Sequence, residues 1–167
     1  MSLGQKTKDS EGWPRSTFDI QDRLVEFHRA MNIPILPTPQ VPADERVRLR
    51  ARLIVEECCE FIEACFRLGP QESEYLHVAI RGYLERTVDS ANVFVNLPEA
   101  ADALADIAYV VEGANLEFGI DSGPVLDEVH RANMAKFGGP VREDGKRLKP
   151  AGWTPPDIAG VLAEQQR

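Results

Sequence analysis

The sequence lacks features that mark several classes of protein. Only 3 of its 167 residues are cysteine, and two of them are adjacent. An odd count with that spacing suits neither a disulfide framework nor a zinc site. We therefore expect Cys58, Cys59 and Cys65 to be small buried apolar residues in a reducing compartment. No run of about 18 apolar residues is present, so the pattern predicts no membrane-spanning helix.

Positive charge is also scarce. The chain has 19 lysines and arginines against 27 acidic residues, which gives a formal net charge of -8. A surface that binds nucleic acid needs basic residues to neutralise phosphates, so we predict no nucleic-acid partner. The first residues, MSLGQKTKDS, lack the apolar segment of a signal peptide. We therefore expect a cytoplasmic protein with no membrane partner.

Strand-like alternation is missing, and apolar residues recur with helical spacing instead. Residues 1–16 are expected to form a disordered tail, and residues 17–167 are long enough for a single domain with its own core. The fold class is predicted to be all-α, a bundle of four main helices completed by dimerisation. Helices are predicted over residues 18–31, 44–68, 98–118 and 124–137, with a weaker helix over 71–88 and a short one near the end of the chain.

The helix predicted over residues 44–68 carries a concentration of acids. Four glutamates fall within ten residues, namely Glu56, Glu57, Glu60 and Glu63. Apolar residues surround them on almost every side, which is typical of a buried helix. Like charges three or four residues apart repel one another, whereas a hard cation such as Mg²⁺ binds carboxylate oxygens. The pattern therefore predicts a metal site, with a solvated charged stripe as the alternative.

A second acidic face lies on the helix predicted over residues 98–118. Glu99, Asp102 and Asp106 share this face, whereas the other faces are mostly apolar. Packed antiparallel, the two acidic stripes can meet around one or more metal ions. The alternative is that both stripes face solvent.

These acids resemble the motifs of the all-α nucleoside triphosphate pyrophosphohydrolases. That superfamily comprises the MazG-like proteins, with phosphoribosyl-ATP pyrophosphohydrolases and dimeric dUTPases as relatives. Its mark is E-E-x-x-E on one helix and E-x-x-D on the next long one. Glu56, Glu57 and Glu60 match the first part, and Asp106 matches the last residue of the second. The chain departs from the pattern at Ala103, where the superfamily has glutamate.

The carboxyl-terminal part carries a second likeness. The segment EVHRANMAKFGGPVREDGKRLKP is similar to the closing block of a MazG-related subgroup that includes dUTP-cleaving members. In that subgroup a helix with an asparagine and a lysine precedes a G-K-x-x-K-P loop. The matching residues are Asn133, Lys136, Gly145, Lys146, Lys149 and Pro150. The likeness covers most of the chain from about residue 20.

The resemblance implies Mg²⁺ dependence, with Mn²⁺ as a substitute, and assembly as a homodimer or homotetramer. It implies cleavage between the α and β phosphates of a nucleoside triphosphate, with dUTP the first candidate. Glu57, Glu60 and Asp106 would hold the metal. Glu56 is the candidate base, although its role can be exchanged with that of Glu57. Asp102 or a water molecule can replace the ligand missing at position 103, or the site is impaired.

The closing block is basic in an otherwise acidic chain, which suggests a local anion site. Asn133 can read a base or sugar, and Lys136 can meet a phosphate. Lys146 and Lys149 lie on a loop that can close over the site, with plain solubility as the alternative. Trp153 is expected to pack this loop down, and stacking on a base is its second reading. The alternatives to a dUTP-cleaving enzyme are a phosphoribosyl-ATP pyrophosphohydrolase and a nucleotide-binding homologue that has lost catalysis.

Overall fold

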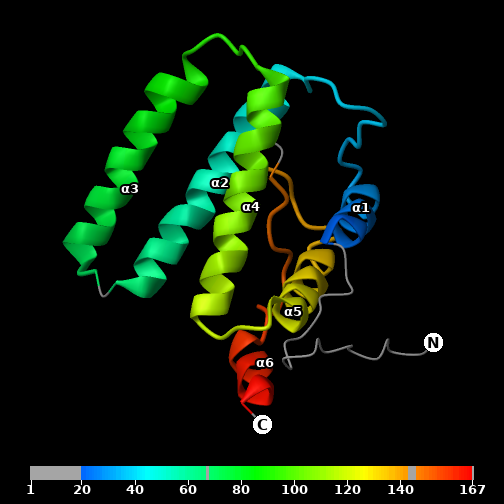
Figure 1. Ribbon diagram of the computed structural model, residues 1–167, viewed down its shortest axis with the longest axis vertical. Coiled ribbons are helices and arrows are strands. Elements are labelled where there is room, and N and C mark those ends of the chain that lie inside the picture. The colour runs from blue at the N-terminus through cyan, green and yellow to red at the C-terminus, as the bar shows by residue number, and fades with distance from the viewer. Residues whose placement is uncertain (1–19, 67, 143–145, 167) are drawn as a thin grey trace. The chain divides into compact units, whose positions relative to one another are not determined.

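The computed structural model describes residues 20–66, 68–142 and 146–166, and these are helical wherever they are regular (Figure 1). Within this part of the chain the β-structure is a single isolated bridge between Val141 and Arg147. The all-α prediction is confirmed. The tail predicted for residues 1–16 lies outside the described residues.

The chain divides into two compact units, and each is formed by separate stretches of sequence. The first unit takes residues up to Pro37, Pro98–Arg142 and Arg147–Arg167, and the second takes Thr38–Leu97 and Glu143–Lys146. The first contains α1 (Ile20–Ala30), α4 (Leu97–Glu117, from Pro98 onward), α5 (Ser122–Met134) and α6 (Ile158–Gln165), and the second contains α2 (Asp44–Cys65), α3 (Pro70–Leu84) and the π-helical turn η1 (Glu85–Asp89).

In the first unit, α1 and α6 both pack against α5 (Figure 1). The α1–α5 pair is linked by an ion pair between Arg23, whose side chain is largely buried, and Asp127. His130 lies 3.3 Å from Glu26 across the same pair of helices. At the other end of α5, Gln165 exchanges two hydrogen bonds of 2.9 Å with the backbone of Asp121. These contacts fix α5 as the central helix of the unit.

In the second unit, α2 and α3 lie side by side (Figure 1). The turn η1 contacts both of these helices. The helix α2 ends at Cys65, three residues before the predicted boundary, because Phe66 adopts an extended backbone. Gly69 precedes α3 and Pro70 occupies its first turn, where a missing N–H costs nothing. The Gly-Pro pair therefore starts α3 rather than ending α2. An ion pair of 2.5 Å between Arg52 and Asp89 holds η1 against α2.

The cysteine prediction is correct for one residue and wrong for two. Cys59 is buried, whereas Cys58 and Cys65 are exposed. Adjacent helical positions point about 100° apart, so a neighbour that covers Cys59 leaves Cys58 uncovered. The same reason limits the burial of α2, where Leu49 is buried but Phe61 is 52% exposed.

Among the described residues, no helix has the length and apolar character needed to cross a membrane.

Candidate functional site

Three glutamates of the first acidic motif lie within two turns of α2. Glu56 is half-buried, and Glu57 and Glu60 are exposed. Lys146, which belongs to the same unit, forms an ion pair of 2.5 Å with Glu56. For Glu60, by contrast, no hydrogen bond or ion pair is found within the described part of the chain. The ammonium group of Lys146 therefore offsets part of the negative charge that the sequence predicts on α2.

Glu63 is set apart from the other three glutamates by its partners on α3. It accepts a hydrogen bond from the Ser73 hydroxyl, and its carboxylate lies 2.9 Å from the His77 ring. The Ser73 hydroxyl, followed by His77, holds the pKa of Glu63 below its usual value. Glu63 therefore joins α2 to α3. Ser73 and His77 are four residues apart on one helical face, and this spacing is the signal by which the pair could have been found.

The second acidic stripe lies on α4, and most of this helix is exposed. Asp102 and Asp106 are both exposed, and Ala103 stands one residue after Asp102. The predicted ligands are thus divided between the two units, since Glu57 and Glu60 belong to the second and the α4 aspartates to the first. Within the described residues of either unit, no three acidic, histidine or cysteine side chains are grouped closely enough to hold a metal ion. Neither stripe makes a complete site alone.

Three of the four predicted substrate-binding residues come together in the first unit. Lys136 donates a 2.7 Å hydrogen bond to the Asn133 side chain one turn earlier on α5. The Trp153 ring lies close to two ammonium groups, with Lys136 Nζ 5.7 Å and Lys149 Nζ 4.5 Å from its centroid. The fourth residue, Lys146, is in the second unit.

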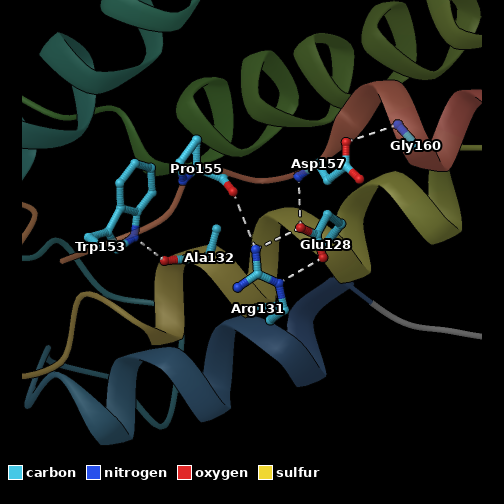
Figure 2. Close-up of polar contacts among 7 residues, drawn as sticks. All are labelled: Glu128, Arg131, Ala132, Trp153, Pro155, Asp157 and Gly160. Atoms are coloured by element: carbon cyan, nitrogen blue, oxygen red, sulfur yellow. Dashed lines mark hydrogen bonds and ion pairs between the residues drawn. The ribbon is translucent and has the colours of Figure 1, made fainter.

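Trp153 joins this cluster to α5. Its indole Nε1–H donates a 2.7 Å hydrogen bond to the Ala132 carbonyl oxygen, as Figure 2 shows. Ala132 is itself buried, at 2% exposure. The expectation that Trp153 packs its loop down is therefore confirmed.

A polar network that the sequence analysis missed continues this attachment (Figure 2). Glu128 accepts two hydrogen bonds from Arg131, at 2.8 and 2.7 Å, and a third of 2.8 Å from the Asp157 backbone N–H. Arg131 also donates to the Pro155 carbonyl oxygen at 3.4 Å. The Asp157 side chain accepts from the Gly160 N–H at 3.0 Å and so caps α6.

The electrostatic effect of this network falls on Glu128. Its hydrogen bonds from Arg131 and then from the Asp157 backbone lower the pKa of Glu128 to about 2. The three-residue spacing of Glu128 and Arg131 is a helix-pair signal that can be read from sequence. Their partners at Pro155 and Asp157 cannot be read from sequence, because no local pattern specifies which loop packs against α5.

The loop after α5 turns at a pair of glycines. Gly138 has a positive φ of 80°, a conformation that favours glycine. Gly139 has no room for a side chain, since an added Cβ would overlap the Leu148 carbonyl oxygen. Arg147 donates to the Gly139 carbonyl at 2.9 Å, and the Leu148 N–H donates to Pro140 at 2.8 Å. The segment leading to Lys149 is thereby held against the end of α5.

An acid-rich helix and a cluster of ammonium groups on an all-α scaffold suit chemistry on phosphate anhydrides, which needs charge neutralisation at the phosphates. The comparisons with known proteins agree. The sequence matches a family described as phosphoribosyl-ATP pyrophosphohydrolase over residues 24–133. Because this match spans more than half of the sequence, the chain belongs to that family and is an all-α pyrophosphohydrolase related to the MazG-like proteins.

A solved structure gives the same result. The fold is similar to that of a protein described as a "putative NTP pyrophosphohydrolase" from Exiguobacterium sp. 255-15, with a TM-score of 0.63 and 26% sequence identity. The likeness covers 89% of this chain and 96% of the other. A comparison with curated proteins gave no match.

Proposed function

We propose that this protein is a Mg²⁺-dependent nucleotide pyrophosphohydrolase that cleaves between the α and β phosphates of a (deoxy)nucleoside triphosphate, with dUTP the first candidate. The products would be a nucleoside monophosphate and pyrophosphate. The observation that carries the proposal is the acid motif on α2, formed by Glu56, Glu57 and Glu60, in a chain of this family. The basic cluster around Trp153 adds a place for the phosphates.

The donor set fits a hard divalent cation. Glu57 and Glu60 are exposed carboxylates on one helix, and Asp106 with Asp102 would supply oxygens from α4. Mn²⁺ accepts the same ligands and should replace Mg²⁺. When bound, the metal would neutralise phosphate charge and polarise a water molecule.

The remaining roles belong to side chains of this chain. Glu56 would accept the proton of the attacking water, an assignment that can be exchanged with Glu57. Lys146 forms an ion pair with Glu56, and its ammonium group would contact a phosphate when the substrate binds. Asn133 would contact the base or sugar, and Lys136 with Lys149 would contact the phosphates.

Assembly as a homodimer or homotetramer is part of the proposal. It is supported by α4, which exposes large apolar side chains along its length, including Leu104 at 56%, Val110 at 65% and Leu116 at 62%. Exposed apolar surface of this extent commonly marks an interface. We place the protein in the cytoplasm, in keeping with a nucleotide substrate.

The test is pyrophosphate release from a panel of ribo- and deoxynucleoside triphosphates, with Mg²⁺ and with excess chelator. Release that requires the metal and favours dUTP is the expected result. Phosphoribosyl-ATP belongs in the panel as the second candidate, because the matched family carries its name. Turnover of phosphoribosyl-ATP alone would replace dUTP by that substrate. Silence across the whole panel would contradict the enzymatic proposal and favour a binding homologue in which Ala103 marks a lost metal ligand.

A further inference from the structure

The proposed function gives the lysines of the first unit a substrate to bind, but it leaves Trp153 as packing. We propose that Trp153 is a positioning residue that holds Lys136 and Lys149 together as a paired ammonium site for the polyphosphate part of the substrate. This inference rests on the proposed function for its ligand and on the geometry around the indole for its mechanism.

The indole ring is the element common to the two lysines. Lys149 Nζ lies 4.5 Å and Lys136 Nζ 5.7 Å from its centroid, both within the range at which an aromatic face attracts a cation. The two nitrogens can therefore be no farther apart than the sum of these distances. The lysines are 13 residues apart in the chain, Lys136 in the turn that follows α5 and Lys149 in the loop before Trp153, and both ammonium groups lie close to the same ring.

The ring is itself fixed on α5. The Nε1–H bond to the Ala132 carbonyl sets one edge of the indole, and Ala132 is buried. Just beyond, Arg131 and Glu128 hold the backbone of Pro155 and Asp157 (Figure 2). The indole is therefore pinned directly at its own edge and indirectly through the four residues that follow it. A lysine side chain resting on such a ring loses less freedom when it binds an anion.

Charge explains why the pair suits a polyphosphate rather than a single carboxylate. Two ammonium groups gathered at one ring repel each other, and the ring offsets only part of that repulsion. For Lys149, no carboxylate partner is found within the described residues. A chain of phosphates carries several negative charges at short spacing, so it can meet both ammonium groups at once. A monophosphate or a neutral nucleoside would gain less from the pair.

The same ring could instead stack on the base of the nucleotide. The geometry favours the positioning role, because the two ammonium groups already occupy the space near the ring and the indole N–H is committed to α5. Base stacking is therefore one outcome of the test that would overturn the proposal.

The experiment uses tryptophan emission as a direct readout. The chain has two tryptophans, so Trp13→Phe leaves Trp153 as the sole source of tryptophan emission. This full-length protein is titrated with inorganic tripolyphosphate and, separately, with uridine, under conditions without turnover. We expect saturable change with tripolyphosphate and none with uridine. A change produced by uridine alone would overturn the proposal in favour of base stacking.

Substitution at position 153 separates the ring from the hydrogen bond. By calorimetry, Trp153→Leu should bind tripolyphosphate about tenfold more weakly than wild type, whereas Trp153→Phe, which keeps an aromatic face, should stay within about threefold. Phe137→Leu is the matched control, since Phe137 is an exposed aromatic residue of the same loop. Equal binding by wild type and the leucine variant would contradict the proposal.

Two further measurements keep the test decisive. If Trp153→Leu does not fold, Lys149→Met in the Trp13→Phe background should both weaken tripolyphosphate binding and alter Trp153 emission, and an unchanged affinity would sink the proposal. If it folds, adding Lys149→Met to Trp153→Leu should cost clearly less than the same change in wild type. With a substrate from the panel, the loss should appear in KM more than in kcat. Because binding is measured without turnover, failure of the enzymatic proposal leaves this result interpretable.

Discussion

Glu60 differs from its neighbouring acids in what it touches. Glu63 is held by Ser73 and His77, and Glu56 by Lys146, whereas Glu60 has no such partner among the described residues. A carboxylate without a structural role is the better candidate for a ligand. We predict that Glu60→Gln lowers kcat by at least about 100-fold while far-ultraviolet circular dichroism and melting temperature stay unchanged.

The matched control is Glu63→Gln. It removes the same charge from the same helix, but at a position that joins α2 to α3. Its melting temperature should fall, because the contact with Ser73 and His77 is weakened, and its kcat should be largely retained. If the two variants lose activity equally, the assignment of Glu60 to the metal is wrong.

Substitution of Ala103 tests whether the absence of the family's glutamate at this position weakens metal binding. A glutamate at this position would add a carboxylate to the acidic face of α4, next to Asp102. We predict that Ala103→Glu lowers the Mg²⁺ concentration needed for half-maximal activity by about tenfold, with a matching gain in Mn²⁺ affinity by calorimetry. Unchanged metal affinity would argue that Asp102 or a water molecule already fills the place.

At the scale of elements, α5 is joined to the start of α6 through Glu128, a carboxyl group whose pKa is lowered by its hydrogen bonds. The ordinary pKa of Glu128 is 4.5, and in the folded chain it is lowered to about 2. As the pH falls, the unfolded chain takes up the proton first, so the stabilisation is complete above pH 4.5 and is lost toward pH 2. The melting-temperature advantage of wild type over Glu128→Gln should therefore shrink as the pH falls from about 4.5 toward about 2. A difference independent of pH would exclude this role.

The turn after α5 gives a second element-scale prediction. Gly139→Ala would push the Leu148 carbonyl away, which should lower the melting temperature and weaken tripolyphosphate binding by displacing Lys149. Gly113→Ala is the matched control, because a Cβ there meets nothing within 4 Å and alanine favours a helix by about 0.5–1 kcal/mol. The two substitutions should therefore shift the melting temperature in opposite directions.

Element boundaries were predictable where local chemistry decides them. The spacing of apolar residues located all the main helices, and α2 begins at Asp44 as expected. The helix α2 ends earlier than predicted because Phe66 has an extended backbone. No glycine or proline stands at that position to indicate the end of the helix. The helix α5 begins at Ser122 rather than near Pro124, because the Asp121 side chain caps it by accepting from the Gly123 N–H.

At the scale of the whole molecule, exposed apolar surface is the dominant feature. The buried apolar side chains among the described residues are small in number, namely Met31, Leu49, Cys59 and Ala132. We predict that the chain sediments as a dimer or tetramer and that its melting temperature rises with protein concentration. A monomer with a concentration-independent melting temperature would contradict this.

The candidate site was predictable only in part, because some of its contacts lie within one helix and others join segments that are distant in the sequence. Spacing on one helix is local, so the acids of α2 and the Asn133–Lys136 pair could be read from the sequence. The contact of Lys149 with Trp153 and that of Lys146 with Glu56 depend on how distant segments return. Such contacts are set by tertiary packing, which no local pattern encodes.

The way the chain divides between its two units has a consequence for its synthesis and ancestry. The first unit draws on residues on both sides of Thr38–Leu97, so it is not a contiguous gene segment that recombination could exchange as a module. During translation, α1 must also wait for α5, and α5 for α6 and the Trp153 segment, before their shared contacts can form. The first unit is thus completed only after Trp153 and α6 have been synthesised, and a ribosome that stops before residue 153 releases a chain in which α5 lacks its contacts with Trp153 and α6.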